Sequence, residues 1–74
     1  MKKQALVRQI AERMGSTETT AALWVDAVIE TMYEQLKVGE SVALPGFGTF
    51  YVRPERAHWV FKFNPSQRLR ALLG

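Results

Sequence analysis

Apolar residues in the first half of the chain recur at the spacing of two amphipathic helices. Gly15 separates the two stretches, as glycine does just past a helix C-terminus, and Ser16 or Thr17 can cap the second helix. Gly39 ends that second helix. The pattern predicts a helical hairpin whose apolar faces need cover. The apolar positions are Leu6, Val7, Ile10, Ala11 and Met14, then Ala21, Leu23, Trp24, Val25, Val28, Ile29, Met32, Tyr33 and Leu36.

After Glu40 apolar and polar residues alternate, which predicts strands with one buried side and one solvent-facing side. Two runs flank Gly46-Phe47-Gly48, and a third run starts at His58. We therefore predict a three-stranded antiparallel sheet with an aromatic face for the helices to cover. The predicted aromatic face holds Val42, Leu44, Phe50, Val52, Trp59, Phe61 and Phe63, and the other face holds Ser41, Ala43, Thr49, Tyr51, Arg53, His58, Val60, Lys62 and Asn64.

The connections in this half are marked by proline and polar residues. Pro54 to Ala57 form the predicted link between the second and third strands, because proline fixes φ at a turn and cannot donate to a strand ladder. Asn64 to Ser66 are predicted to break the third strand, and a short helix from Gln67 to Leu73 follows. The order helix-helix-strand-strand-strand-helix predicts an α+β fold in a single domain, residues 1–74.

The chain is short and apolar, with 74 residues, 47% of them hydrophobic, and no cysteine. A domain of this size buries only about 60% of its unfolded surface when it folds alone. No disulfide or thiolate metal site can add stability, and small chains of this kind often complete their core with a second copy. We therefore expect a homodimer, with core residues Phe47, Phe50, Trp59, Phe61 and Phe63.

The sequence offers little chemistry for catalysis. His58 is the only histidine and no convincing nucleophile–base pair is present, so we expect neither an enzyme, nor a metal site, nor a cofactor. No apolar run approaches about 20 residues, so no membrane span is expected. Met1-Lys2-Lys3 is not followed by the apolar block of a signal peptide, which predicts a cytoplasmic location.

Positive charge is concentrated in the second half of the chain. Residues 1–40 contain five basic and six acidic side chains, a net charge of −1. Residues 41–74 contain five basic side chains and Glu55 as their single acid, a net charge of +4. This asymmetry is typical of a protein that binds a polyanion, although a solubilising surface charge explains it equally well on composition alone.

The stretch LPGFGTFYVR, Leu44 to Arg53, resembles the HU and integration host factor family of bacterial histone-like DNA-binding proteins, whose signature is a Gly-Phe-Gly-Thr-Phe turn. The ending FNPSQRLR, Phe63 to Arg70, is similar to the family's Phe-(Lys/Arg)-Pro-Gly-(Gln/Lys)-Lys-Leu-Lys close. The resemblance runs over nearly the whole chain. It implies an intertwined homodimer with a helical base, a sheet saddle that faces duplex DNA, and a place in the bacterial nucleoid.

The chain departs from the family between its second and third strands. The resemblance implies a long β-ribbon arm there, with a proline near the tip that wedges between base pairs and kinks the duplex. Here only Pro54 to Ala57 remain, and Pro54 stands at the stump of the arm. Ser66 replaces the family's usual glycine, and Asn64 stands where a basic residue is common. We therefore expect an arm-less member that does not kink DNA as the family does.

The candidate DNA contacts rest on glycine and on basic side chains. Gly46 and Gly48 expose peptide N–H groups that in the family lie close to phosphates, although turn geometry alone would justify them. Arg68 and Arg70 lie in the first turns of the last helix, where the helix dipole disfavours positive charge, and a phosphate bound at this helix start would make their position favourable. For Arg68 an ion pair with a nearby acid is the alternative. The full set is Lys3, Gly46, Gly48, Arg53, Arg56, Lys62, Asn64, Ser66, Arg68 and Arg70.

Two functions remain in competition. The first is an HU-like nucleoid-associated, architectural protein, a dimer that contacts duplex DNA phosphates with little sequence specificity. The second is an HU-like protein-interaction or scaffold domain that has lost the DNA-bending function and partners other HU-like proteins, for example as a heterodimer. The charge of +4 in residues 41–74 favours the first, and the missing arm favours the second.

Overall fold

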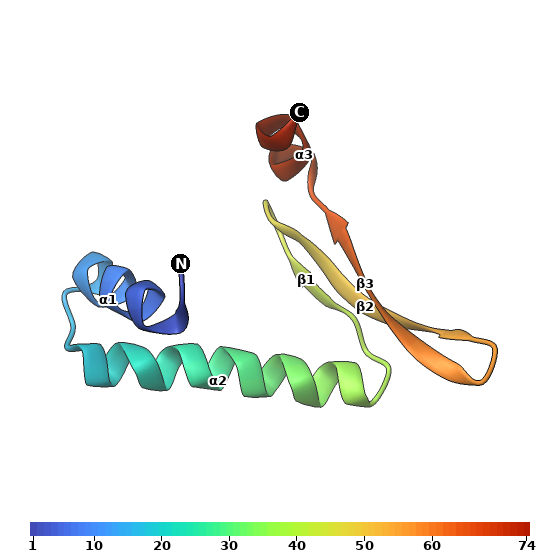
Figure 1. Cartoon of the computed structure of the whole chain (residues 1–74), viewed down its shortest axis with the longest axis horizontal. Coiled ribbons are helices and arrows are strands. Elements are labelled where there is room, and N and C mark those ends of the chain that lie inside the picture. Colours follow the sequence, from blue (N-terminus) through green and yellow to red (C-terminus); the bar gives the residue numbers. More distant parts are fainter. The chain divides into compact units, whose positions relative to one another are not determined.

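The computed structural model describes residues 1–74 as three helices and one three-stranded antiparallel sheet, which confirms the predicted α+β order (Figure 1). The chain divides into two compact units, Met1–Thr31 (the first unit) and Met32–Gly74 (the second unit). None of the helices combines the length and the hydropathy that a membrane crossing requires. The elements are α1 (Lys3–Met14), α2 (Glu18–Lys37), β1 (Val42–Leu44), β2 (Gly48–Glu55), β3 (His58–Pro65) and α3 (Gln67–Leu73).

The first unit contains α1, the loop after it and most of α2. Gly15 ends α1 in a left-handed conformation, with φ of 63°, and the Ser16 N–H donates to the Ala11 carbonyl at 2.9 Å. Thr17 caps α2, because its Oγ1 accepts a hydrogen bond from the Thr20 N–H at 3.2 Å. Of the two predicted caps, Thr17 is therefore the one that the structure uses.

The core of the first unit consists of small apolar side chains. Val7 and Ala11 of α1 and Ala21 and Val25 of α2 are all buried. They are the only fully buried hydrophobic residues in the chain. Ile10 and Ala22, which are partly buried, pack against this cluster.

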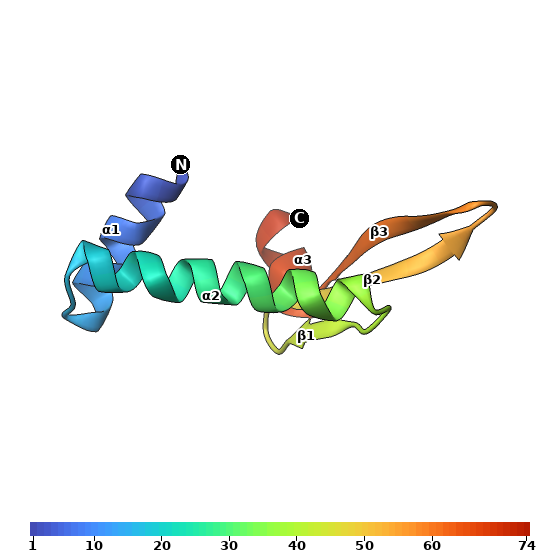
Figure 2. The same ribbon diagram turned by 90° about the horizontal axis from the view of Figure 1, so that it is seen from below.

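The sheet of the second unit is a ribbon of two strands, β2 and β3, with the shorter strand β1 along one edge. β1 pairs only with residues 48–50 of β2, whereas β2 and β3 pair along their whole length, from Gly48 opposite Pro65 to Glu55 opposite His58. The ribbon therefore continues beyond β1, as Figure 2 shows. The turn that closes it contains just two residues, Arg56 and Ala57.

Two predicted strand ends were wrong. Pro54 and Glu55 belong to β2 and are not part of the connection, and β3 continues through Pro65. Pro54 fits inside the strand because β1 ends before it, so one edge of β2 needs no backbone donor there. Only Ser66 separates β3 from α3.

The register confirms the two predicted faces of the sheet. Phe50 lies opposite Phe63, and Val52 lies opposite Phe61, all on the aromatic face. The rings of Phe47, Phe50, Phe61 and Phe63 form a cluster in which neighbouring centroids lie between 4.6 and 6.2 Å apart. These separations are favourable for tilted and offset aromatic pairs.

Several large side chains of this aromatic face are exposed in the single chain. Phe47 is 47% exposed, Phe61 56% and Trp59 64%, and no apolar side chain of the second unit is fully buried. Part of the predicted apolar stripe of α2 is exposed too, including Val28 and Tyr33. Large apolar side chains of both units are thus exposed in the single chain.

Candidate nucleic-acid interface

The link between β1 and β2 is a tight turn that requires Gly46. The Phe47 N–H donates to the Leu44 carbonyl at 2.9 Å, which closes a four-residue β-turn. Pro45 occupies its second position and Gly46, with φ of 84°, its third. This combination is the signature of a type II turn, where the third residue needs positive φ. A Cβ on Gly46 would meet nothing closer than Arg68 Nη1 at 4.0 Å, so the backbone here is open to a ligand.

Gly48 has a different role from Gly46. It is buried, and a Cβ placed on it would lie 2.6 Å from the Asn64 carbonyl oxygen and 2.6 Å from the Phe63 ring. The absent side chain therefore makes room for β3 to pack against β2. This finding corrects the expectation that both glycines expose their backbone, because only Gly46 does so in the chain.

The polar face of the ribbon brings two predicted contacts together. Lys62 lies opposite Tyr51, and Arg53, two residues along β2, lies opposite Val60. Residues two apart on a strand share a face, so Arg53 and Lys62 project from the same side of the sheet. Both side chains are partly exposed and accessible to a ligand.

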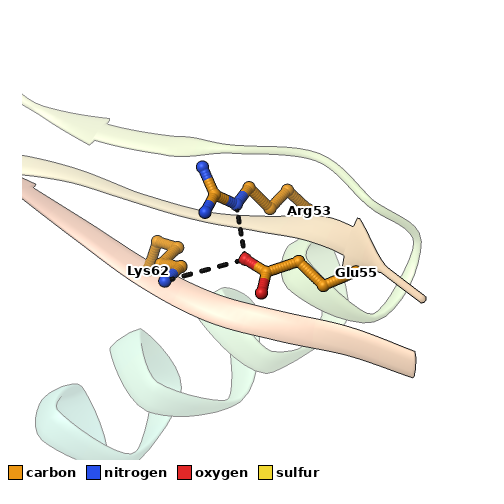
Figure 3. Close-up of polar contacts among 3 residues, drawn as sticks. All are labelled: Arg53, Glu55 and Lys62. Carbon is orange, nitrogen blue, oxygen red and sulfur yellow. Dashed lines mark hydrogen bonds and ion pairs between the residues drawn. The ribbon is translucent and has the colours of Figure 1, made fainter. Parts of the chain in front are cut away.

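Glu55 joins these two cations into a single charged cluster. Its Oε2 lies 2.7 Å from Arg53 Nε and 3.8 Å from Lys62 Nζ, as Figure 3 shows. The hydrogen bond from Arg53 holds the pKa of Glu55 below its usual value, and the same bond raises the pKa of Arg53. Glu55 is therefore ionised at neutral pH. In the sequence Glu55 stands out only as an acid near these cations, but its spacing of two from Arg53 places both side chains on one face of a strand and so signals this contact.

Three of the predicted contacts at the end of β3 are engaged within the chain. Ser66 caps α3, because its Oγ accepts from the Leu69 N–H at 3.2 Å. Arg70 donates from Nε to the Pro65 carbonyl at 3.2 Å and from Nη2 to Asn64 Oδ1 at 2.9 Å. These bonds give Asn64, Ser66 and Arg70 a structural role in fixing α3 to the end of the ribbon.

Arg68 is placed differently from Arg70. Its guanidinium makes no ion pair or hydrogen bond in the chain, so the predicted alternative of a nearby acid is not found. It lines a groove with the turn at Gly46, between the β1–β2 link and α3. The free guanidinium and the open backbone of Gly46 thus adjoin. The groove is completed by Pro45, Phe47, Leu69, Ala71 and Leu72.

The remaining two predicted contacts are Arg56 and Lys3. Arg56 sits in the two-residue turn, exposed, with φ of 55°, which is unusual for a residue other than glycine. Lys3 belongs to the first unit, where its Nζ forms an ion pair with Asp26 Oδ1 at 2.7 Å. Lys3 therefore already has an anionic partner, whereas Arg56 has none.

No cluster of three or more His, Cys, Asp or Glu side chains is arranged to hold a metal ion. The interface consists of cations, one carboxylate and open backbone. These groups can bind an anion such as a phosphate, but they form no nucleophile–base arrangement.

Comparison with known proteins places the chain among small bacterial DNA-binding proteins. The profile of the family described as "Bacterial DNA-binding protein" matches residues 1–58. The SPbeta prophage-derived DNA-binding protein HU 2 of Bacillus subtilis is 47% identical over 57 residues, covering 77% of this chain and 61% of that relative. DNA-binding protein HU of Thermotoga maritima is 37% identical over 57 residues, covering 77% of this chain and 63% of the relative. The chain thus spans about three-fifths of the length of these relatives.

Solved structures extend the similarity to the whole chain. HU from Thermotoga maritima matches with a TM-score of 0.86 and 32% identity over 100% of both chains. HU from Anabaena, solved as a cocrystal with DNA, matches with a TM-score of 0.89 and 26% identity over 99% of this chain and 97% of that one.

The element order and the whole-chain structural match define an α+β protein with the HU fold. The chain belongs to the bacterial DNA-binding protein family that includes HU, as the sequence resemblance predicted. Its β2–β3 connection is the two-residue turn at Arg56 and Ala57, which joins two strands of eight residues each, and the lack of a long arm stays a prediction.

Proposed function

We propose that the chain is a nucleoid-associated DNA-binding module that contacts duplex DNA through backbone phosphates, with little sequence specificity. The surface of the second unit carries this proposal. Arg53 and Lys62 lie on the polar face of the ribbon, Arg56 at its turn, and Arg68 beside the open backbone of Gly46. Cations of this kind hold phosphates without reading bases. The DNA-binding names of the relatives and the Anabaena cocrystal support the proposal.

We also propose that two copies form the active species, and that residues 1–74 of each act as one HU-like domain. The exposed aromatic face supports this, because Phe61 and Trp59 are more than half exposed in the single chain. A second copy would cover that face and supply a second set of cations. Related HU-like chains are candidate heterodimer partners, because they too could cover the exposed aromatic face.

Titration of duplex DNA at several salt concentrations tests the DNA-binding proposal. Each neutralised phosphate contributes about −0.9 to the slope of log affinity against log salt concentration. Arg53, Arg56, Lys62 and Arg68 supply four cations in each copy, and Glu55 neutralises one of them, so a dimer would make roughly six contacts. Its affinity should then fall on the order of a thousand-fold between about 50 and 200 mM salt.

Arg68→Ala localises the effect. It should reduce the slope by up to about 1.8 in a dimer and weaken binding to all sequences alike, since it removes only backbone contacts. Arg13→Ala is the matched control, because Arg13 is an exposed arginine in the last turn of α1. Equal effects of the two variants, or a shallow slope for the parent protein, would contradict the proposed site.

We further propose that binding occurs without arm-mediated kinking, because the ribbon ends in a two-residue turn and has no arm tip. Ligase-mediated circularisation of short duplexes measures this property. We expect little stimulation relative to Thermotoga maritima HU, and comparable stimulation would mean that another residue bends the duplex.

The short ribbon also favours a second candidate, an HU-like protein-interaction or scaffold domain. That function predicts duplex binding at low salt only, with a shallow slope and no special effect of Arg68→Ala. The same titration therefore separates the two functions.

A further inference from the structure

Glu55 is the single acidic residue among residues 41–74, and it lies between two of the proposed phosphate contacts. Its Oε2 contacts Arg53 Nε at 2.7 Å and approaches Lys62 Nζ to 3.8 Å (Figure 3). The other polar-face positions opposite or beside these groups are Tyr51, His58 and Val60, and none of them is acidic. The cluster therefore has one anion and two cations, and it is closed by contacts within a single chain.

A carboxylate and a phosphate compete for the same donors. Both accept charge-assisted hydrogen bonds from guanidinium and ammonium groups. Because Glu55 is attached to the strand that carries Arg53, it meets Arg53 at a high effective concentration, whereas a DNA phosphate must arrive from solution. All three side chains are partly exposed, so a phosphate can reach them and the existing pairs are weak enough to exchange.

We infer that Glu55 is a built-in competitor for the phosphate backbone, which holds Arg53 and Lys62 and lowers both the affinity for duplex DNA and its dependence on salt. This inference deepens the proposed function and rests on it. The mechanism is displacement: a bound phosphate takes the Arg53 Nε–H from Glu55, and the carboxylate is then left close to the phosphate. Binding is weakened by the lost contact and by the repulsion between the two anions.

The test uses Glu55→Gln, which keeps the size of the side chain and an oxygen acceptor but removes the charge. An exposed ion pair of this kind corresponds to a factor of about two to five in a binding constant, so two copies should together raise duplex affinity about tenfold at about 50 mM salt. The salt slope should steepen by about 0.9 for each copy, because each copy gains one unpaired cation. Circular dichroism checks that the fold is kept, and Glu55→Ala serves as a second variant.

The matched control is Glu34→Gln, which changes the net charge equally at an exposed position of α2 without an ion pair. A second comparison repeats Glu55→Gln in an Arg53→Ala background. If Glu55 acts by holding Arg53, the gain in affinity should shrink when Arg53 is absent. A general charge effect would give the same gain in both backgrounds.

Each outcome decides the matter separately from the proposed function. A larger gain for Glu55→Gln than for Glu34→Gln, reduced by Arg53→Ala, supports the competitor role. Equal gains from the two glutamine variants, or a loss of affinity with Glu55→Gln, overturn it. A steep salt slope of the parent protein would in that case still support the proposed function. If neither the parent nor Glu55→Gln binds duplex DNA at any salt concentration, the proposed function and the competitor role both fail.

Discussion

The helical hairpin of the first unit and the sheet of the second unit bury their apolar side chains to very different extents. Val7, Ala11, Ala21 and Val25 are at most 8% exposed, whereas Trp59 and Phe61 are 64% and 56% exposed. The hairpin buries small side chains from both of its helices. The sheet has large rings on one face, and β1 contributes only three residues to it.

This difference teaches which part of the fold depends on a partner. Aromatic rings carry a large hydrophobic driving force, but only when something covers them. A single hairpin or small sheet is marginal without packing on its apolar face. The first unit therefore contains its own core, and the second unit supplies surface that a second copy would complete.

The largest effect is expected for Phe61→Ala. If a second copy covers the ring, the free energy of unfolding should fall by about 3–5 kcal/mol. Loss of a ring that stays half exposed would cost only about 1 kcal/mol. Urea unfolding at several protein concentrations, with sedimentation equilibrium on the same samples, measures both stability and association. Leu72→Ala, at a position 78% exposed in the single chain, is the comparison, and equally small costs would show that the aromatic face stays uncovered.

A smaller effect is expected within the sheet itself, at the two glycines. Gly46→Ala should cost about 1 kcal/mol, since an alanine with positive φ is strained but meets no neighbour. Gly48→Ala should cost about 1–3 kcal/mol more, because its Cβ would press on the Asn64 carbonyl and the Phe63 ring. Denaturant midpoints of the two variants give the difference. A Gly48→Ala variant as stable as Gly46→Ala would mean that β3 can move away from β2 at little cost.

The helix caps provide one probe in each unit. Thr17 caps α2 in the first unit and Ser66 caps α3 in the second, and replacing either with alanine should cost about 1 kcal/mol. We expect both variants to lower one common unfolding midpoint, because α2 runs through both units. Unfolding followed by far-ultraviolet circular dichroism and by tryptophan fluorescence tests this. Separate transitions, each shifted by only one variant, would show that the units unfold independently.

The smallest effect is expected at the ribbon turn. Arg56 has φ of 55°, and asparagine tolerates this conformation better than arginine does. Arg56→Asn should therefore raise the free energy of unfolding by about 0.5 kcal/mol, while removing a proposed phosphate contact. Thermal unfolding together with a duplex titration separates the two consequences. A less stable variant would indicate that the arginine side chain itself holds the turn.

Much of the fold was predictable because its signals are local. The spacing of apolar residues located the helices, and alternation assigned Phe50, Phe61 and Phe63 to one face of the sheet. The prediction that Pro54 belongs to a turn was wrong, because a proline with polar neighbours is typical of a turn but here lies inside β2. A strand can contain proline where its edge is not paired with another strand. Here β1 is too short to pair with β2 at Pro54, and this follows only from the strand pairing in the folded sheet.

The candidate site was less predictable than the fold. Basic residues can be counted in a sequence, but their partners cannot, and Arg70, Lys3 and Lys62 each have a contact within the chain. The meeting of Lys62 with Glu55 depends on the strand register. The two glycines of the Gly-Phe-Gly motif looked equivalent, and only the packing of Phe63 and Asn64 against Gly48 distinguishes them.

The short β1 strand has a consequence for how copies of the chain can associate. It leaves the outer edge of β2 unpaired from Tyr51 onward, and such an edge can recruit strands from other molecules and start aggregation. Pro54 interrupts the row of backbone donors along this edge, and the charges of Arg53 and Glu55 flank it. Edge-to-edge growth is thereby discouraged. The aromatic face of the sheet can therefore pack against one partner to form a dimer, while further strand pairing into aggregates is disfavoured.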